Sequence, residues 1–490
     1  MRVFRLFSVV ILATLGLHAN VRLPALISDH MMVQRDLPVK IWGHADAGEE
    51  VSVTFADAKA TVKADGLGRW IAVLPPMTAG GPFDLTINTT VIKDVLVGEV
   101  WVASGQSNMG FTTGRAANGA QEAASANFPQ IRLFQVKHKV SDVPLWDVDG
   151  SWQSAAPDAV KNFTAVGYFF ARNLNEKLRV PIAIIESDWG GTPAEAWTSP
   201  MALTADSTLT PILHEWAKAI AAYPDAMAMH EKRVKDWEAK RAAGGKDPAP
   251  APPMGPGHPW TPGGLYNAMI APLTNYGIRG AIWYQGESNT GLARVYLYER
   301  LFETMIQDWR RAWGQGDFPF LFVQLANFAK TGKAADWPEL REAQRRSLSL
   351  RNTGMAVAID VGNPDDIHPT NKQDVGLRLS LAARAVAYGE KLVYSGPAFR
   401  VAAPSGAAMR VWFEQAGGLR AKDGGELKGF EIAGRDGVYK PASARVENDT
   451  VLVAHSQVAE PVSVRYAWAD DPACNLVNGD GLPASPFRSR

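Results

Sequence analysis

One stretch, residues 95–109, constrains the fold of this chain more than any other. Its largely apolar, valine-rich first part (95–103) ends abruptly in Gly-Gln-Ser-Asn, which predicts a buried strand followed by a tight loop. Such a loop presents one hydroxyl, that of Ser107. An ordinary strand-end turn has the same pattern, and Met109 stands where the nucleophile elbow of α/β-hydrolases needs glycine. Ser107 is therefore a candidate nucleophile that needs partners elsewhere in the chain.

From residue 95 onward, strand patterns alternate with helical stretches, which is typical of βαβ units and a mainly parallel sheet. The predicted strands are residues 95–103, 131–136, 181–186, 280–284, 319–324 and 355–359. Helices are predicted at 165–177, 295–313 and 369–388, the last with Pro369 in its first turn. We therefore expect a three-layer α/β core with right-handed crossovers over residues 95–390.

Short alternating strands separated by glycine turns flank this core and predict sandwich-like β regions at 20–94 and 391–490. We expect the C-terminal region to pack on the N-terminal one. An insertion at 202–263 interrupts the core, with helices that we expect to break at Pro224 and a proline-rich segment after them. We interpret the insertion as a surface excursion packed on the core, and a lid that shapes the substrate site is the alternative.

The N-terminus has the three parts of a secretory signal peptide over residues 1–19: Arg2 and Arg5, an apolar run (6–17) and a short end. The apolar run is too short to span a bilayer comfortably, although a retained anchor is the alternative. We therefore expect a secreted or periplasmic bacterial protein without stable membrane insertion once the signal is removed. The lone Cys474 excludes an intrachain disulfide and a cysteine-based metal site.

The balance of charges narrows the class of substrate. Lys plus Arg (50) equals Asp plus Glu (50), so no overall field favours nucleic acid, and a neutral or weakly charged substrate fits best.

His368, in Asp-Asp-Ile-His-Pro, has the best surroundings for a general base. Asp365 can fold back to accept its Nδ1 proton, and Asp366 is the second candidate. A helix N-cap cluster with a surface histidine would have the same pattern.

Two more strand ends offer groups that could stabilise an oxyanion. The glycines of Trp-Gly-Gly-Thr (189–192) can present a backbone N–H without a side chain in the way, and Asn289 can offer its amide. Glycines after strands are usually plain turns, so each signal is weak alone. The carboxyl ends of parallel strands meet at one edge of a sheet, so we expect these groups to converge with Ser107 and His368.

As a set, Ser107, the glycine pair, Asn289 and the Asp-x-x-His pattern resemble the four blocks of the SGNH hydrolase superfamily. More narrowly, several runs are similar to the sialate O-acetylesterase family of carbohydrate esterases. These runs are residues 98–109, 189–197, 265–273, 283–289 and 366–372, and the similarity extends from about Leu23 to the end. The resemblance implies an SGNH-type core that removes acetyl groups from sialic acids, or from polysaccharides such as xylan and xyloglucan, without a metal or other cofactor.

The resemblance also implies roles. It makes Ser107 the nucleophile and His368 the base, with the Ser107 N–H, a glycine N–H and Asn289 as oxyanion donors. The superfamily spacing points to Asp365 as the acid that orients His368, whereas the narrower family points to Asp366. We choose Asp365, and we choose Gly191 over Gly190. Possible contacts to the sugar, or supports of the site, are Gln106, Glu195, Trp197, Gln285 and Glu287.

Two rival functions remain. A catalytically inactive carbohydrate-binding protein would suit the 16 tryptophans and the flanking β regions, although most tryptophans are expected in cores. A metal-dependent hydrolase is disfavoured, because the sequence has no His-x-x-x-His or clustered ligand set.

Overall fold

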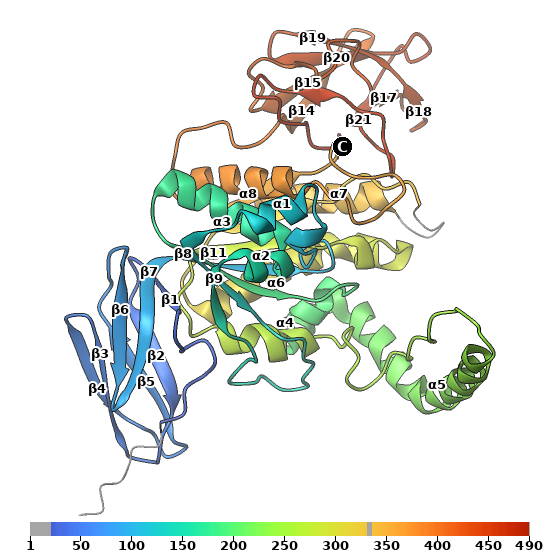
Figure 1. Cartoon of the computed structure of the whole chain (residues 1–490). Coiled ribbons are helices and arrows are strands. Elements are labelled where there is room, and N and C mark those ends of the chain that lie inside the picture. Colours follow the sequence, from blue (N-terminus) through green and yellow to red (C-terminus); the bar gives the residue numbers. More distant parts are fainter. Residues whose placement is uncertain (1–20, 331–335, 490) are drawn as a thin grey trace, which may run out of the picture.

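The computed structural model describes residues 21–330 and 336–489 (Figure 1). The predicted signal peptide, residues 1–19, lies outside these ranges. Within them, no helix is both long and apolar enough to cross a bilayer. An N-terminal β region, a central α/β core and a C-terminal β region follow one another along the chain, and the two β regions lie at opposite ends of the core (Figure 1).

Short strands form the N-terminal region, as the alternating pattern predicts. In β5, for example, Trp70, Ala72 and Leu74 are buried while the residues between them are exposed. β3 pairs with β4 and β6, β6 and β1 pair with β7, and β2 pairs with β5. The strands are β1 (Met32–Gln34), β2 (Val39–His44), β3 (Glu50–Phe55), β4 (Ala58–Lys63), β5 (Arg69–Leu74), β6 (Gly80–Ile87) and β7 (Thr90–Gly105).

Strand β7 joins the N-terminal region to the core. Its first half is antiparallel to β6, with Thr90 opposite Ile87, and its second half lies parallel between β10 and β11. The predicted strand at 95–103 is thus the inner part of a longer one. Because one rigid strand crosses both sheets, it holds the loop that carries Ser107 at a fixed position at the edge of the core.

The core sheet has the order β13-β12-β11-β7-β10-β8-β9, in which every neighbouring pair is parallel except β8 and β9. Its other strands are β8 (Phe128–Gln135), β9 (Trp152–Ala155), β10 (Ile182–Asp188), β11 (Gly280–Tyr284), β12 (Phe320–Gln324) and β13 (Thr353–Val357). Strands β8 to β10 lie on one side of β7, with β10 next to it, and β11 to β13 follow in order on the other side. This change of direction leaves a crevice at the carboxyl end of β7, where open α/β sheets bind ligands.

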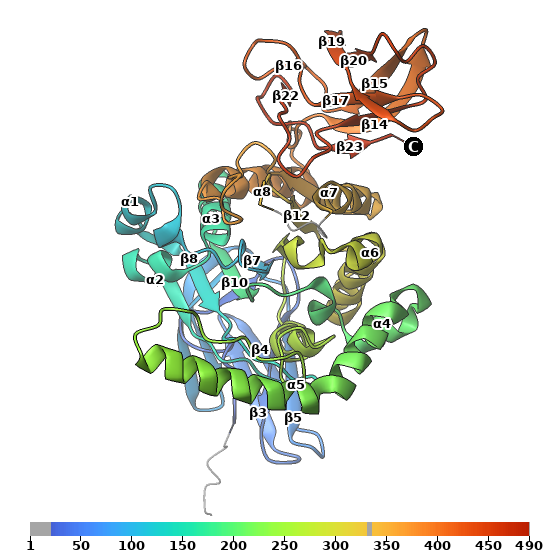
Figure 2. The ribbon, with the colours of Figure 1, turned by 90° about the vertical axis from the view of Figure 1, so that its right-hand side faces the viewer.

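Helices cover both faces of the sheet, which gives the predicted three layers (Figures 1 and 2). On one face Phe170 of α3 packs against Trp101, and on the other Phe302 of α6 packs against Trp283. Trp283 is level with Ser104, three residues from Trp101, so the two tryptophans face opposite sides. The helices are α1 (Gly119–Ala124), α2 (Pro157–Asn162), α3 (Ala165–Leu178), α4 (Pro200–Ala205), α5 (Thr210–Ala242), α6 (Leu292–Trp313), α7 (Trp337–Arg346) and α8 (Lys372–Val386).

Two helix predictions are wrong in detail. Helix α5 runs without a break through Pro224, because a proline removes one backbone hydrogen bond and the rest of a long helix continues on both sides. Helix α8 begins at Lys372 and not at Pro369, because the side chain of Asn371 accepts a hydrogen bond from the Asp374 N–H and caps the first turn. Residues 365–371 therefore remain a loop.

The C-terminal region has its own hydrophobic core and lies beyond α7 and α8, far from the N-terminal region (Figure 1). The expectation that the two β regions pack together is therefore wrong. The fully buried Arg341 of α7 instead donates to the carbonyl oxygens of Ala469 and Asp470. The strands are β14 (Ala398–Ser405), β15 (Ala408–Glu414), β16 (Arg420–Ala421), β17 (Phe430–Ala433), β18 (Tyr439–Pro441), β19 (Ser443–Glu447), β20 (Thr450–Ala454), β21 (Ser463–Tyr466), β22 (Leu476–Val477) and β23 (Phe487–Arg488).

Candidate active site

The loop after β7 is shaped to present Ser107. Gly105 has φ +139°, and a Cβ there would lie 2.2 Å from the Tyr284 carbonyl oxygen, so the tight approach requires glycine. The N–H groups of Met109 and Gly110 then donate to the Gln106 carbonyl oxygen at 2.8 and 3.0 Å, which closes the turn. Ser107 is left half-buried at the outer end of the strand.

The structure brings His368 to this hydroxyl from 261 positions further along the chain. Its Nε2 lies 2.8 Å from the Ser107 Oγ, within hydrogen-bond distance for proton transfer. Its ring stacks on Phe111, with 6.3 Å between the centroids. Burial lowers the pKa of His368 below its usual 6.5, and the Asp366 carboxylate partly offsets this. A pKa lowered in this way keeps the ring neutral, as a general base must be.

Asp366, and not Asp365, lies next to His368. The Asp366 carboxylate accepts a hydrogen bond from the backbone N–H of His368 at 2.9 Å, in a short turn. The same carboxylate comes within 3.7 Å of the ring Nδ1. The Asp365 carboxylate points away and pairs with Lys330 at 3.1 Å. Our choice of Asp365 does not agree with this geometry, because the two-residue side-chain turn sets the direction of the loop.

The glycine pair adjoins Ser107. A Cβ on Gly190 would lie 3.2 Å from the Ser107 Cβ, whereas Gly191 has φ +74° and open space around it. In the described ranges, the N–H groups of Ser107, Gly190 and Gly191 donate to no protein acceptor. Donors left free beside a nucleophile are what an oxyanion hole needs. Gly190 is nearer to Ser107 than Gly191, the residue that we chose.

Asn289 is held in one orientation by its neighbours. It ends the short helix η6 (Glu287–Asn289), and its Oδ1 accepts from the Ala194 N–H at 3.0 Å and the Gln285 amide at 2.7 Å. Its Nδ2 donates to Glu195 at 2.9 Å. A primary amide carries two N–H donors, and the second donates to no protein acceptor among the described residues. Asn289 is buried and does not line the cavity that contains Ser107.

Four of the five possible substrate contacts act as supports of this framework. Trp197 and Gln285 are fully buried, and the Trp197 indole donates to the Thr192 hydroxyl at 2.9 Å. The Gln106 side chain accepts from the N–H groups of Gly286 and Ser288, and Glu287 accepts from Asn108 at 2.6 Å. The fifth, Glu195, is buried but also borders a cavity.

A buried polar group near Ser107, the side chain of Lys372, was not predicted from the sequence. The Lys372 ammonium donates to the Asn108 side chain at 2.5 Å, and burial lowers the pKa of Lys372 from 10.5 to about 7. Asn108 follows Ser107 directly and also donates to the Ile367 carbonyl oxygen at 2.9 Å. These contacts tie the serine loop to the histidine loop. The position of Lys372 directly after a helix cap does not indicate in the sequence that its side chain is buried.

Acidic residues line the cavity in front of Ser107, which holds about 290 Å³. Glu186 and Asp188 end β10, and burial raises the pKa of both carboxyl groups. His138 borders the same cavity and stacks on Trp189 at 4.3 Å. The Glu-Ser-Asp sequence at the end of this strand could have indicated the two carboxylates. The predicted site included only the glycines that follow it.

Comparison with known proteins shows the family of this chain. The chain is 33% identical to the sialate O-acetylesterase of Mus musculus over 95% of its own length and 94% of the mouse protein. It is 31% identical to the sialate O-acetylesterase of Homo sapiens, over 95% of the chain and 92% of the human protein. The chain belongs to the sialate O-acetylesterase family.

A solved structure extends this assignment to the fold. A carbohydrate acetylesterase from Xanthomonas citri is 40% identical, with a TM-score of 0.83, over 96% of this chain and 99% of that one. The family model described as "Carbohydrate esterase, sialic acid-specific acetylesterase" matches residues 255–387, which include Asn289 and His368. The predicted resemblance is confirmed, and this member of the sialate O-acetylesterase family is a carbohydrate O-acetylesterase.

Proposed function

We propose that this esterase removes O-acetyl groups from sugars through an acetyl-serine intermediate. The hydrogen bond of 2.8 Å between the His368 Nε2 and the Ser107 Oγ carries the proposal, because it joins a nucleophile to its base. It also favours an enzyme over an inactive carbohydrate-binding protein.

In the first half-reaction, the Ser107 Oγ attacks the acetyl carbonyl carbon while His368 takes the hydroxyl proton. The Ser107 N–H, the N–H groups of the Gly190–Gly191 turn and the free Asn289 N–H stabilise the oxyanion. The bond between the carbonyl carbon and the sugar oxygen then breaks, and His368 returns its proton to that oxygen. In the second half-reaction His368 takes a proton from a water, whose oxygen attacks the acetyl carbon. The bond from this carbon to the Ser107 Oγ breaks, His368 returns the proton to Oγ, and acetate is released.

The substrate range is tested by acetate release from acetylated sialic acid, acetylated xylan and acetylated xyloglucan, with p-nitrophenyl acetate as a sugar-free reference. The Ser107→Ala variant serves as the blank for each. We expect the wild type to release acetate from at least one of the three above this blank. Turnover of p-nitrophenyl acetate alone would contradict a carbohydrate substrate.

We propose that Asp366 holds His368 in place, and a pH profile tests this. Because a base acts only when neutral and burial lowers the pKa of His368, kcat/KM of the wild type should decline with falling pH only below 6.5. Asp366→Asn removes a charge that raises this pKa, so this decline should move to lower pH. The loss of the negative charge near Nδ1, which stabilises the protonated ring in the transition state, should also lower kcat/KM about tenfold on the plateau.

The neighbouring Asp365→Asn is the matched control. It removes the same charge one residue away, from a carboxylate paired with Lys330, and should change neither the pH profile nor the plateau. A loss in Asp365→Asn that exceeds the loss in Asp366→Asn would restore Asp365 as the orienting acid.

We also propose that the protein is exported to the periplasm or the medium, because its apolar N-terminal run, residues 6–17, is typical of a signal peptide. N-terminal sequencing of the mature protein should find a new start near residue 20, and a retained Met1 would contradict it.

A further inference from the structure

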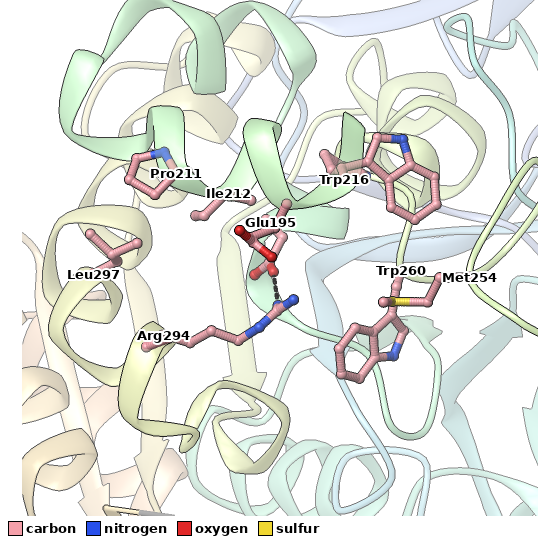
Figure 3. Close-up of a pocket in the computed structure, with 11 residues that line it drawn as sticks. Glu195, Pro211, Ile212, Trp216, Met254, Trp260, Arg294 and Leu297 are labelled. Carbon is pink, nitrogen blue, oxygen red and sulfur yellow. Dashed lines mark hydrogen bonds and ion pairs between the residues drawn. The ribbon is translucent and has the colours of Figure 1, made fainter. Parts of the chain in front are cut away.

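A second cavity, of about 290 Å³, lies where the insertion meets the core (Figure 3). Its volume is just below the range of small-ligand pockets, about 300–1,000 Å³, and is large enough for one sugar ring. The beginning of α5, the proline-rich segment, the short helix η2 (Ala194–Trp197) and the first turns of α6 all contribute to its walls. The lining residues include Glu195, Ile212, Trp216, Met254, Trp260 and Arg294.

Two tryptophans form one side of this cavity, which we call the insertion cavity. Figure 3 shows the indoles of Trp216 and Trp260 on the same side, with Met254 between them. Both indoles are half-buried, so their faces are in part accessible. Flat aromatic faces at accessible positions suit the apolar C–H faces of a sugar ring, which bury area without losing the hydroxyl hydrogen bonds.

Charged groups provide the polar part of the cavity. The Arg294 guanidinium pairs with the buried Glu195 carboxylate and lies 4.9 Å from the Trp260 ring centroid (Figure 3). An ion pair fixed in this way offers both donors and acceptors to hydroxyl groups. Among the described lining residues Arg294 is the one cation, and a second carboxylate, Glu215, also borders the cavity. The cavity therefore disfavours a ligand that carries a carboxylate.

The insertion cavity is connected to the nucleophile by two contacts. The Trp260 indole donates to the Gly191 carbonyl oxygen at 2.7 Å, and Gly190, the preceding residue, adjoins Ser107. Glu195 accepts from Asn289, the proposed oxyanion donor, at 2.9 Å. Trp260 thus contacts the residue that follows Gly190, and Glu195 contacts Asn289 directly. In the proposed function, Gly190 and Asn289 face the acetyl ester.

We propose that the insertion cavity is a subsite for a neutral sugar ring next to the acetylated sugar, so that the substrate is an oligosaccharide or polysaccharide. This rests on the proposed function. The insertion is then part of the substrate site and not only a surface excursion.

The test compares an acetylated sugar chain with an ester too small to reach the cavity. For each variant, kcat/KM is measured on acetylated xylo-oligosaccharides, acetylated xyloglucan oligosaccharides and p-nitrophenyl acetate. Trp216→Ala should lower the ratio of the oligosaccharide value to the p-nitrophenyl acetate value at least about tenfold, mainly through KM. Ala293→Trp, which fills the cavity from an exposed position and removes no contact, should have the same effect.

Trp237→Ala is the matched control, because Trp237 is a half-buried tryptophan of the same helix that does not line the cavity. It should leave the ratio unchanged within about twofold. Circular dichroism confirms that each variant is folded.

Three outcomes would overturn the subsite. One is a ratio that stays constant in both cavity variants, and another is an equal fall in Trp237→Ala. The third is wild-type acetate release from acetylated sialic acid but from neither oligosaccharide, which would leave the proposed esterase function intact. The absence of hydrolysis of every ester would instead contradict the proposed function itself.

Discussion

Replacing Ser107 with alanine is expected to lower kcat/KM for p-nitrophenyl acetate at least about 10⁴-fold. The alanine variant retains the base and the oxyanion donors but cannot form the acetyl-enzyme, so only slow attack by water remains. Acetate release from the best sugar substrate should fall by the same factor. Burst-phase kinetics on p-nitrophenyl acetate check the step directly, because the burst reports the covalent intermediate.

Ser104→Ala is the matched control for this variant. Ser104 lies on β7, three residues before Ser107, and its buried hydroxyl has no hydrogen-bond partner in the described structure. Its removal should leave kcat/KM within about twofold of the wild type. Equal hydrolysis by the wild type and Ser107→Ala would show that the nucleophile is another residue.

Replacing His368 with alanine is expected to cost nearly as much, at least about 10⁴-fold in kcat/KM at neutral pH. The Ser107 hydroxyl then has no base at 2.8 Å to take its proton, and the leaving sugar oxygen has no acid. Because the two residues act as a unit, Ser107→Ala combined with His368→Ala should be no slower than the slower single variant within about tenfold. Losses that multiply in the double variant would mean that the two residues act independently.

Regular patterns in the sequence predicted most of the core. Strand β11 has its predicted bounds, and the other five predicted core strands begin or end within a few residues of prediction, because buried parallel strands are continuous apolar runs. The short antiparallel edge strand β9 was not predicted. The meeting of Ser107 with His368 was also predictable, since both follow strand ends at one edge of the sheet.

Features that depend on side-chain turns and on tertiary contacts were not predictable. Whether Asp365 or Asp366 faces His368 depends on a turn in which Asp366 accepts the His368 N–H. The proposed role of the insertion depends on Trp216 and Trp260, which are 44 residues apart and line one cavity only when α5 and the proline-rich segment fold onto the core. Neither the orientation of Asp366 nor the approach of the two tryptophans follows from a regular spacing in the sequence.

The central claim is that Ser107 is the nucleophile, and labelling with a fluorophosphonate tests it most directly. Attack by an activated serine forms an oxygen–phosphorus bond and expels fluoride, which leaves a stable adduct that peptide mass spectrometry can locate. We predict one adduct per chain, on Ser107, with loss of acetate release in proportion to labelling and no adduct in Ser107→Ala. An adduct on a different residue, or full acetate release from enzyme completely labelled at Ser107, would contradict the claim.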